Sequence, residues 1–247
     1  MKIVCVIPAR FESSRFKGKP IAKILNKPMI WWVYNQVKKV DLINEIYVAT
    51  DDQRIVNVCQ KYGINTILTS VNHLTHLDRL FEVSQKINFD LIINVNGDEP
   101  IIDPEVIKHF IPKKVNINKS LIFNAYTKLI RPSHLIDNSK IKVVMDVNKN
   151  ALYFSRSAIP YPQKENNVDY NKFIGLQVFT RKSLEFCGHQ KRGPLESTED
   201  IDEFRFIENG HQIKMIEVIS ASISVDSKKD IEYVEKYIKD NPNMFVE

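Results

Sequence analysis

The chain of 247 residues contains only three cysteines and no apolar run approaching the roughly 20 residues that cross a membrane. Cys5, Cys59 and Cys187 are scattered and odd in number, which predicts a reducing cytoplasm and not a disulfide framework. No spacing of cysteine and histidine resembles a zinc site. Residues 1–2 lead directly into an apolar strand, so we expect neither a signal peptide nor a membrane partner.

The charge of the chain is moderate, at +5, and its basic residues form no run interleaved with aromatic side chains. Such a run would be the footprint of a nucleic-acid-binding surface. The hydrophobic fraction of 43% is ordinary for a globular protein, and there is no internal repeat or low-complexity tract. We therefore expect no nucleic acid as a partner and a small anionic molecule as a substrate.

Strands and helices alternate through the first half of the chain, which predicts an α/β fold. A mostly parallel, helix-covered Rossmann-like sheet within one domain over residues 1–247 fits this pattern. Ligands of such sheets lie beyond the carboxyl ends of the strands. The expected strands are Ile3–Ile7, Glu45–Ala49, Asn65–Leu68 and Leu91–Val95; the expected helices run from Pro28 to about Val40, after Asp51 or Asp52, over Arg79–Ile87 and from Pro104.

The pattern changes at about Ser120, where strands follow one another with few helices between them. We expect residues 120–180 to form an antiparallel excursion on the main sheet. Its strands are predicted at Ser120–Thr127, Ile141–Met145, Ala151–Ser155 and Phe173–Phe179, followed by a helix over Thr198–Asn209, a strand over Lys214–Ser224 and a final helix over Lys228–Lys239.

The loop after the first strand gathers cations and small residues. Arg10, Arg15, Lys17 and Lys19 lie within ten positions, close to Ser13, Ser14 and Gly18. Backbone N–H groups can approach a polyphosphate closely in such a loop, and guanidinium and ammonium groups balance its charge. Composition alone equally allows an ordinary basic surface loop.

Two acids stand where strands are expected to end. Asp98 follows a buried strand within Asn-Gly-Asp-Glu, and Asp226 follows Ser224 and Val225 just before the last helix. Mg²⁺ prefers one or two carboxylates together with phosphate oxygens and water. Taken singly, the first segment could be a plain turn and the second a helix cap.

The sequence resembles the bacterial Kdo cytidylyltransferases, which activate 3-deoxy-manno-octulosonate (Kdo) as its CMP derivative. The resemblance covers nearly the whole chain, and three of the seven glycines lie within its motifs. The motifs are IPARFESSRFKGKP (7–20), NKPMI (26–30), YVATDD (47–52), NVNGDEP (94–100), KVVMD (142–146), ALYFSRSAIP (151–160), IGLQVF (174–179), PLESTEDIDEFR (194–205) and SVD (224–226).

The resemblance implies a nucleotidyltransferase-type fold, CTP and Mg²⁺ as ligands, and a homodimer to which the excursion contributes. It implies catalytic roles for Arg10, Lys19 and Asp98, and a metal site at Asp98 and Asp226. An acidic sugar would attack the α-phosphorus of CTP and release pyrophosphate. The nucleotide-binding residues would be Pro8, Ala9, Arg10, Ser13, Arg15, Lys19 and Asn96, the last of which stands where the family has a glutamine.

The departures from the family pattern gather on the acceptor side. His76 and Leu77 replace a small glycine and a threonine, Phe173 replaces a histidine and Gln177 a tyrosine. A family Glu-Gln pair is here Asp202–Glu203. The acceptor-binding residues implied by the resemblance are Arg79, Arg156, Phe173, Gln177, Asp202 and Glu203.

The nucleotide side keeps the family pattern and the acceptor side departs from it, so three hypotheses follow. The first is a Kdo cytidylyltransferase. The second is a CMP-transferring enzyme for another acid, such as a nonulosonate, an amino-substituted Kdo or a phosphonate, which would use Kdo at least about tenfold less well than its true acceptor because the altered side chains remove hydrogen bonds. The third, a non-catalytic nucleotide-binding protein, is disfavoured because both candidate metal acids and the basic loop are present.

Overall fold

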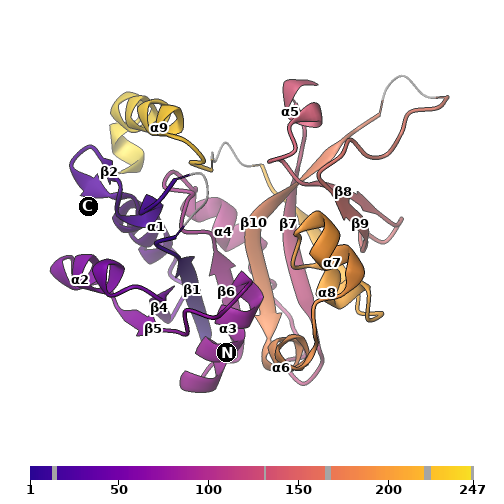
Figure 1. The fold of residues 1–247 in the computed structure, drawn as a ribbon, viewed down its shortest axis with the longest axis horizontal. Helices are drawn as coiled ribbons and strands as arrows, with labels where there is room; N and C mark the ends of the chain where they lie inside the picture. The colour runs from indigo at the N-terminus through magenta and orange to yellow at the C-terminus, as the bar shows by residue number, and fades with distance from the viewer. Residues whose placement is uncertain (13–15, 131, 165–167, 220–223, 246–247) are drawn as a thin grey trace.

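The computed structural model describes residues 1–12, 16–130, 132–164, 168–219 and 224–245 (Figure 1). Ser13 and Arg15, two of the expected nucleotide-binding residues, lie outside these ranges. Figure 1 shows one mixed sheet with helices packed against it on both sides. Within the described ranges no helix has both the length and the apolar character needed to traverse a bilayer.

The parallel half of the sheet agrees with the sequence prediction. Strand β1 (Ile3–Ala9) lies between β4 (Glu45–Thr50) and β6 (Leu91–Val95), and β5 (Thr66–Leu68) forms the edge beside β4. The alternate side chains of β1 pack into different cores: Cys5 and Ile7 on one face, Val4 and Val6 on the other. A strand that is apolar on both faces is typical of the middle of a parallel sheet covered by helices.

Helices follow these strands at positions set by local capping. They are α1 (Met29–Lys38), α2 (Gln53–Lys61), α3 (His76–Lys86) and α4 (Pro104–Phe110), and short pieces η1 (Lys19–Ile21), β2 (Lys23–Ile24) and β3 (Lys27–Pro28) precede α1. The side chain of Asp52 caps α2 and that of Asp103 caps α4. Helix α3 begins three residues before its predicted start, because Thr75 and Asp78 form a capping box.

The antiparallel part is joined to the same sheet through β10 (Asn171–Thr180). This strand pairs antiparallel with both β6 and β7 (Ile122–Lys128), and β11 (Ile213–Glu217) adds parallel to β7. The hairpin of β8 (Lys142–Met145) and β9 (Ala151–Ser155) branches from the start of β10. The order of the main path is β11-β7-β10-β6-β1-β4-β5.

Some elements differ from the sequence prediction. The single helix expected over Thr198–Asn209 is wrong: α7 (Pro194–Glu199) and α8 (Phe204–Ile207) are separated by Asp200, whose φ of +52° lies in the left-handed region that ends a right-handed helix. The strand expected to reach Ser224 ends at Glu217. The remaining helices are α5 (Pro132–Ile136), α6 (Arg181–His189), α9 (Lys228–Asp240) and the short η2 (Pro242–Met244); α9 confirms the predicted final helix.

Candidate active site

A cavity of about 590 Å³ lies beyond the carboxyl ends of β1 and β6, where parallel α/β sheets bind their ligands. Segments from both halves of the chain line it. From the first half come Pro8, Ala9, Arg10, Glu12, Lys19, Pro20, His76, Arg79, Asn96, Gly97 and Asp98; from the second come Ile141, Phe173, Gln177, Asp200, Ile201, Asp202 and Glu203.

A second cavity of about 200 Å³ adjoins the first. The two share Asn96, Asp98, Ile141 and Phe173 as lining residues. Arg156 and Asp226, which do not reach the larger cavity, line the smaller one. Every site residue predicted from the sequence that falls in the described ranges therefore borders one of these two adjoining spaces.

The end of the larger cavity where the nucleotide is predicted to bind is built by a close approach of two strand ends. A Cβ atom at Gly97, after β6, would stand 2.8 Å from the carbonyl oxygen of Pro8 in β1, so a side chain at this position would force the strand ends apart. Gly18 takes a positive φ of 70° and donates its backbone N–H to Phe11 at 2.8 Å. This turn delivers Lys19 to the cavity.

The two predicted metal acids converge on Lys19. Its Nζ lies 2.6 Å from Oδ2 of Asp98 and 3.8 Å from Oδ1 of Asp226. The backbone N–H of Val225 donates to the carbonyl of Asp98 at 2.9 Å, which holds the two acidic segments together. The loop cation and the carboxylates, 79 positions apart for Lys19 and Asp98, thus form one site.

This pair of acids suits a divalent cation better than a metal that needs a complete set of protein ligands. The Oδ1 atom of Asp98 is buried and accepts no hydrogen bond from the described residues. No group of three His, Cys, Asp or Glu side chains arranged for a metal is present in the described part of the chain. Mg²⁺ is usually held by one or two carboxylates and takes its other oxygens from substrate phosphates and water.

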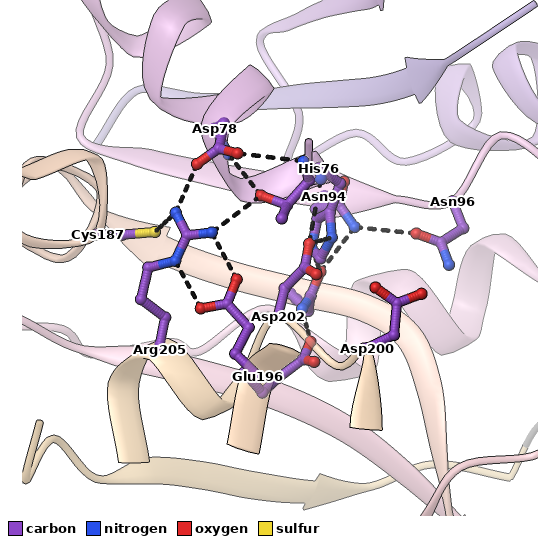
Figure 2. Close-up of polar contacts among 12 residues, drawn as sticks. His76, Asp78, Asn94, Asn96, Cys187, Glu196, Asp200, Asp202 and Arg205 are labelled. Atoms are coloured by element: carbon purple, nitrogen blue, oxygen red, sulfur yellow. Dashed lines mark hydrogen bonds and ion pairs between the residues drawn. The ribbon is translucent and has the colours of Figure 1, made fainter. Parts of the chain in front are cut away.

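The end of the larger cavity where the acceptor is predicted to bind holds a polar network centred on His76 and Gln177. The imidazole Nδ1 of His76 lies 2.6 Å from Asp202, and its Nε2 lies 3.1 Å from the Gln177 amide oxygen. Asn94 also donates to this amide oxygen, at 2.8 Å, and the Gln177 amide N–H donates to Glu203. Both imidazole nitrogens face acceptors, so the geometry favours the doubly protonated imidazolium. Figure 2 shows His76, Asn94 and Asp202 meeting at this point.

The charges of this network shift the pKa values of its members. Burial raises the pKa of Glu203 to about 7. Burial alone would lower the pKa of His76, but the adjacent Asp202 carboxylate outweighs it and raises that pKa to about 9. Burial opposes ionisation of Asp202 as well, yet the imidazolium of His76 keeps the pKa of this carboxyl below its usual value. The pair is therefore ionised at neutral pH.

This ion pair predicts a pH dependence of stability. The pKa of His76 is about 9 in the folded protein against an ordinary value of 6.5, so its contribution is complete below about pH 6.5 and disappears as the pH rises to 9. We expect the free energy of unfolding of the wild type to decrease over this range and the His76→Gln variant to lose most of the decrease. Urea unfolding at stepped pH measures both, and parallel curves for the two proteins would contradict the assignment.

A second buried network supports the acceptor side from behind. The guanidinium of Arg205 in α8 binds Glu196 through two contacts, of 3.0 and 2.5 Å, and Asp78 at 2.5 Å (Figure 2). Asp78 caps α3, the helix that carries His76 at its first position. Arg205 thus fixes the start of α3 relative to the segment that carries Asp202. Arg205 is the last residue of the motif PLESTEDIDEFR (194–205), which contributes to the family resemblance. Nothing in the sequence predicts that Glu196 and Asp78 are its partners.

The two arginines predicted to bind the acceptor have their donors engaged by the protein. Arg79 is 1% exposed and binds Thr69 and, at 2.7 Å, Asp51. Arg156 donates to backbone carbonyls, among them that of Glu199 at 2.7 Å. Both side chains border a cavity. A direct contact with the acceptor stays a prediction for each.

Comparisons of the sequence with known proteins find relatives that match nearly the whole chain. A sequence model of the family described as cytidylyltransferase matches residues 4–216. The 3-deoxy-manno-octulosonate cytidylyltransferase of Fusobacterium nucleatum is 40% identical over 98% of both chains. The mitochondrial 3-deoxy-manno-octulosonate cytidylyltransferase of Arabidopsis thaliana is 34% identical over 97% of this chain and 84% of its own.

Solved structures agree with these sequence matches. The structure of CMP:2-keto-3-deoxy-manno-octonic acid synthetase complexed with CTP superimposes with a TM-score of 0.90 at 33% identity, over 98% of this chain and all of the other. A 4-diphosphocytidyl-2C-methyl-D-erythritol synthase from Anaerococcus prevotii superimposes with a TM-score of 0.60 at 16% identity, over 96% of this chain and 99% of its own. The latter likeness shows the fold alone.

Proposed function

The chain belongs to the cytidylyltransferase family, and on this premise we propose that it transfers CMP from CTP to Kdo and releases pyrophosphate. The observation that carries the proposal is the meeting of three groups of residues around two adjoining cavities. These groups are the cationic loop at Lys19, the carboxylates of Asp98 and Asp226, and the polar network at Gln177. A nucleotidyl transfer needs a triphosphate site, a metal site and an acceptor site in contact with one another.

The nucleotide side has the charge that a triphosphate requires. Arg10 is exposed at the cavity, and Lys19 reaches it from the turn at Gly18. Pro8 and Ala9 bring the end of β1 beside them, and Asn96 supplies an amide for the nucleotide. The ammonium of Lys19 would balance phosphate charge as the leaving pyrophosphate forms.

The reaction itself asks for positioning more than for covalent work by the protein. The hydroxyl on the anomeric carbon of the acceptor attacks the α-phosphorus in line, one O–P bond forms, the bond to pyrophosphate breaks and the hydroxyl proton is released. Asp98 and Asp226 would hold Mg²⁺, which supplies Lewis-acid stabilisation of phosphate charge when bound. Asn94, Gln177 and Glu203 would orient the sugar hydroxyls.

Two further proposals concern the oligomeric state and the cellular location of the protein. The exposed apolar side chains of Ile130, Ile136 and Leu152, all within residues 120–180, support a homodimer contact there. Sedimentation equilibrium measures the oligomeric state.

The three cysteines are free and buried, which is compatible with a cytoplasmic protein.

Pyrophosphate release from CTP across a panel of acids tests the function. Turnover with Kdo supports the proposal, and turnover restricted to a nonulosonate, an amino-substituted Kdo or a phosphonate supports a different acceptor. One observation favours keeping these acids in the panel: the Gln177 amide, which replaces a family tyrosine, is engaged by Asn94, His76 and Glu203. Binding of CTP without turnover of any acid would contradict the enzyme assignment.

Charge removal in the nucleotide loop should affect CTP and not the acceptor. We expect Lys19→Ala and Arg10→Ala to lower kcat/KM for CTP by about tenfold or more, because each removes a charge-assisted contact to phosphate. Steady-state kinetics with each substrate varied in turn measures this. Lys17→Ala is the matched control, since Lys17 pairs with Glu12 at 2.9 Å on the surface. Unchanged CTP kinetics in both alanine variants would make the phosphate-loop assignment wrong.

A further inference from the structure

The loop that carries Arg10 and Lys19 is closed at its base by a backbone hydrogen bond. The N–H of Gly18 donates to the carbonyl of Phe11 at 2.8 Å. Arg10 directly precedes this pair in the chain, and Lys19 directly follows it. The places of Arg10 and Lys19 at the larger cavity therefore depend on where Phe11 and Gly18 lie.

The aromatic ring of Phe11 packs on this base. A Cβ atom at Gly18 would stand 3.3 Å from the ring atoms Cε2 and Cζ, so the ring rests directly on the backbone of Gly18. Phe11 is also partly buried against the hydrophobic core that contains Cys5 and Ile7 of β1. The ring thus joins the base of the loop to the central sheet.

A guanidinium from helix α2 stacks on the same ring. The Cζ atom of Arg54 lies 3.3 Å from the ring centroid of Phe11, a distance at which the face of the ring attracts the cation. Lys17 of the loop is farther away, with its Nζ 6.0 Å from this centroid, at the limit of such a contact. Arg54 is therefore the cation that holds the ring most closely.

The carboxylate of Asp52 fixes the position of this guanidinium. Nε of Arg54 donates to Oδ1 of Asp52 at 2.9 Å, and Nη2 donates to Oδ2 at 2.6 Å, which is a forked pair. Asp52 also caps α2 by accepting the backbone N–H of Arg54 at 2.8 Å. The hydrogen bond from Arg54 keeps the pKa of Asp52 below its ordinary value. The guanidinium is thus held by the start of α2, outside the loop.

Arg54 contacts the loop and does not itself line either cavity. Its Nη2 lies 4.0 Å from Glu12, at the outer limit of an ion pair, and the Glu12 carboxylate is closer to Lys17, at 2.9 Å. The side chain of Arg54 is 56% exposed, and an exposed ion pair contributes little to the free energy of unfolding. The stack on Phe11 is therefore the contact through which Arg54 can act on the site.

A triphosphate that binds both cations needs them in place at the same time. If the base of the loop moves freely, the loop loses conformational freedom when the ligand binds, and this loss reduces the affinity. A contact that already holds the base in the free protein removes part of that loss. A flat guanidinium fixed at both nitrogens by a carboxylate is suited to such a contact.

We propose that Arg54 is a positioning residue whose guanidinium, held by Asp52, stacks on Phe11 and keeps Arg10 and Lys19 in place for the triphosphate of CTP. The inference rests on the proposed function, because it takes CTP as the ligand. Arg54 then affects the binding of the nucleotide and leaves the chemical step and the acceptor unaffected.

Calorimetric titration of the intact protein with CTP and Mg²⁺ tests the proposal. We expect Arg54→Ala to raise the Kd for CTP by about three- to fivefold, because it removes the stack on Phe11. Arg54→Lys should raise it by a similar factor, since an ammonium reproduces neither the flat stack nor the fork to Asp52. The kcat at saturating CTP and the KM for Kdo should stay within about twofold of wild type. The melting temperature should fall by less than about 3 °C.

A double variant shows whether Arg54 acts through the ring. Phe11→Leu removes the aromatic face, so adding Arg54→Ala to it should change the Kd for CTP little further, and the two effects should not add. Hydrogen exchange of the Gly18 amide gives a readout without CTP. It should be faster in Arg54→Ala than in wild type, because the base of the loop opens more often. If Phe11→Leu does not fold, the Gly18 exchange and the comparison of Arg54→Lys with Arg54→Ala decide.

Lys61→Ala is the matched control, because it removes an exposed cation from the last residue of the same helix. It should keep the wild-type Kd for CTP and the wild-type exchange of Gly18. An unchanged Kd in folded Arg54→Ala would overturn the proposal, whatever the exchange of Gly18. A wild-type Kd in Arg54→Lys beside a raised Kd in Arg54→Ala would also overturn it, since charge alone would then account for the effect. A wild-type protein that binds no CTP would instead contradict the proposed function.

Discussion

Asp98→Asn and Asp226→Asn should each lower kcat by at least about a hundredfold and leave the fold intact. Each exchange removes one negative charge while keeping the shape of the side chain. A hundredfold loss corresponds to about 2.7 kcal/mol of transition-state stabilisation, within the several kcal/mol that a metal ion can supply at phosphate oxygens. Asp98 should show the larger loss, because its buried Oδ1 has no hydrogen-bond donor among the described residues and Lys19 depends on its Oδ2.

The measurement combines pyrophosphate release at saturating Mg²⁺ with direct binding of Mn²⁺ followed by electron paramagnetic resonance. Asp169→Asn is the control, since Asp169 is exposed and pairs only with surface Lys128 among the described residues. We expect the two active-site variants to bind Mn²⁺ in the presence of CTP more weakly than this control. Near-normal rates and normal Mn²⁺ binding in either variant would remove that residue from the metal site.

The parallel half of the fold was predictable because each of its strands is marked by an apolar run within one short segment of the sequence. The β1 segment is apolar from Ile3 to Ile7 and runs into Pro8, and β6 is apolar except for Asn94 and is followed by Asn96, Gly97 and Asp98. Such runs identify buried parallel strands, and the rule that ligands lie at their carboxyl ends then predicted the positions of Lys19 and Asp98. The structure brings these two residues within 2.6 Å of each other.

The acceptor side was less predictable because its contacts join distant segments. His76 lies 101 positions from Gln177 and 126 positions from Asp202 in the chain. No local sequence pattern predicts contacts between residues so far apart. The left-handed conformation of Asp200, which divides the helix expected there, has no strong sequence signal. Only the family resemblance singled out these positions.

The residues that depart from the family pattern contact one another in the structure. His76, Gln177, Asp202 and Glu203 were noted as separate substitutions, and they bind one another in a single network. An imidazolium in place of glycine brings a positive charge that balances Asp202. An amide in place of tyrosine links that imidazolium to Glu203. These side chains therefore form one connected unit at the predicted acceptor site.

The buried ion pair of Arg205 with Glu196 lies behind this network, and Glu196→Ala should destabilise the protein by about 3–5 kcal/mol. Glu196 is fully buried and Arg205 is 2% exposed, so the substitution leaves the core guanidinium with Asp78 as its one remaining carboxylate partner among the described residues. Removing one partner of a buried pair is costly because the remaining charge stays desolvated. Urea unfolding at neutral pH measures the free energy. Asp169→Ala, which breaks an exposed pair with Lys128, should cost less than about 1 kcal/mol.

A double variant distinguishes the stranded charge from simple loss of packing. Glu196→Leu combined with Arg205→Met removes both charges and keeps apolar volume, so it should be more stable than Glu196→Ala. Asp78 would still cap α3 through Thr75 in this variant, so the helix that carries His76 should persist. Equal destabilisation by the single and double variants would mean that packing and not charge dominates at Arg205. A cost below about 1 kcal/mol for Glu196→Ala would mean that Asp78 alone satisfies Arg205, and the support of the acceptor network would then rest on that single contact.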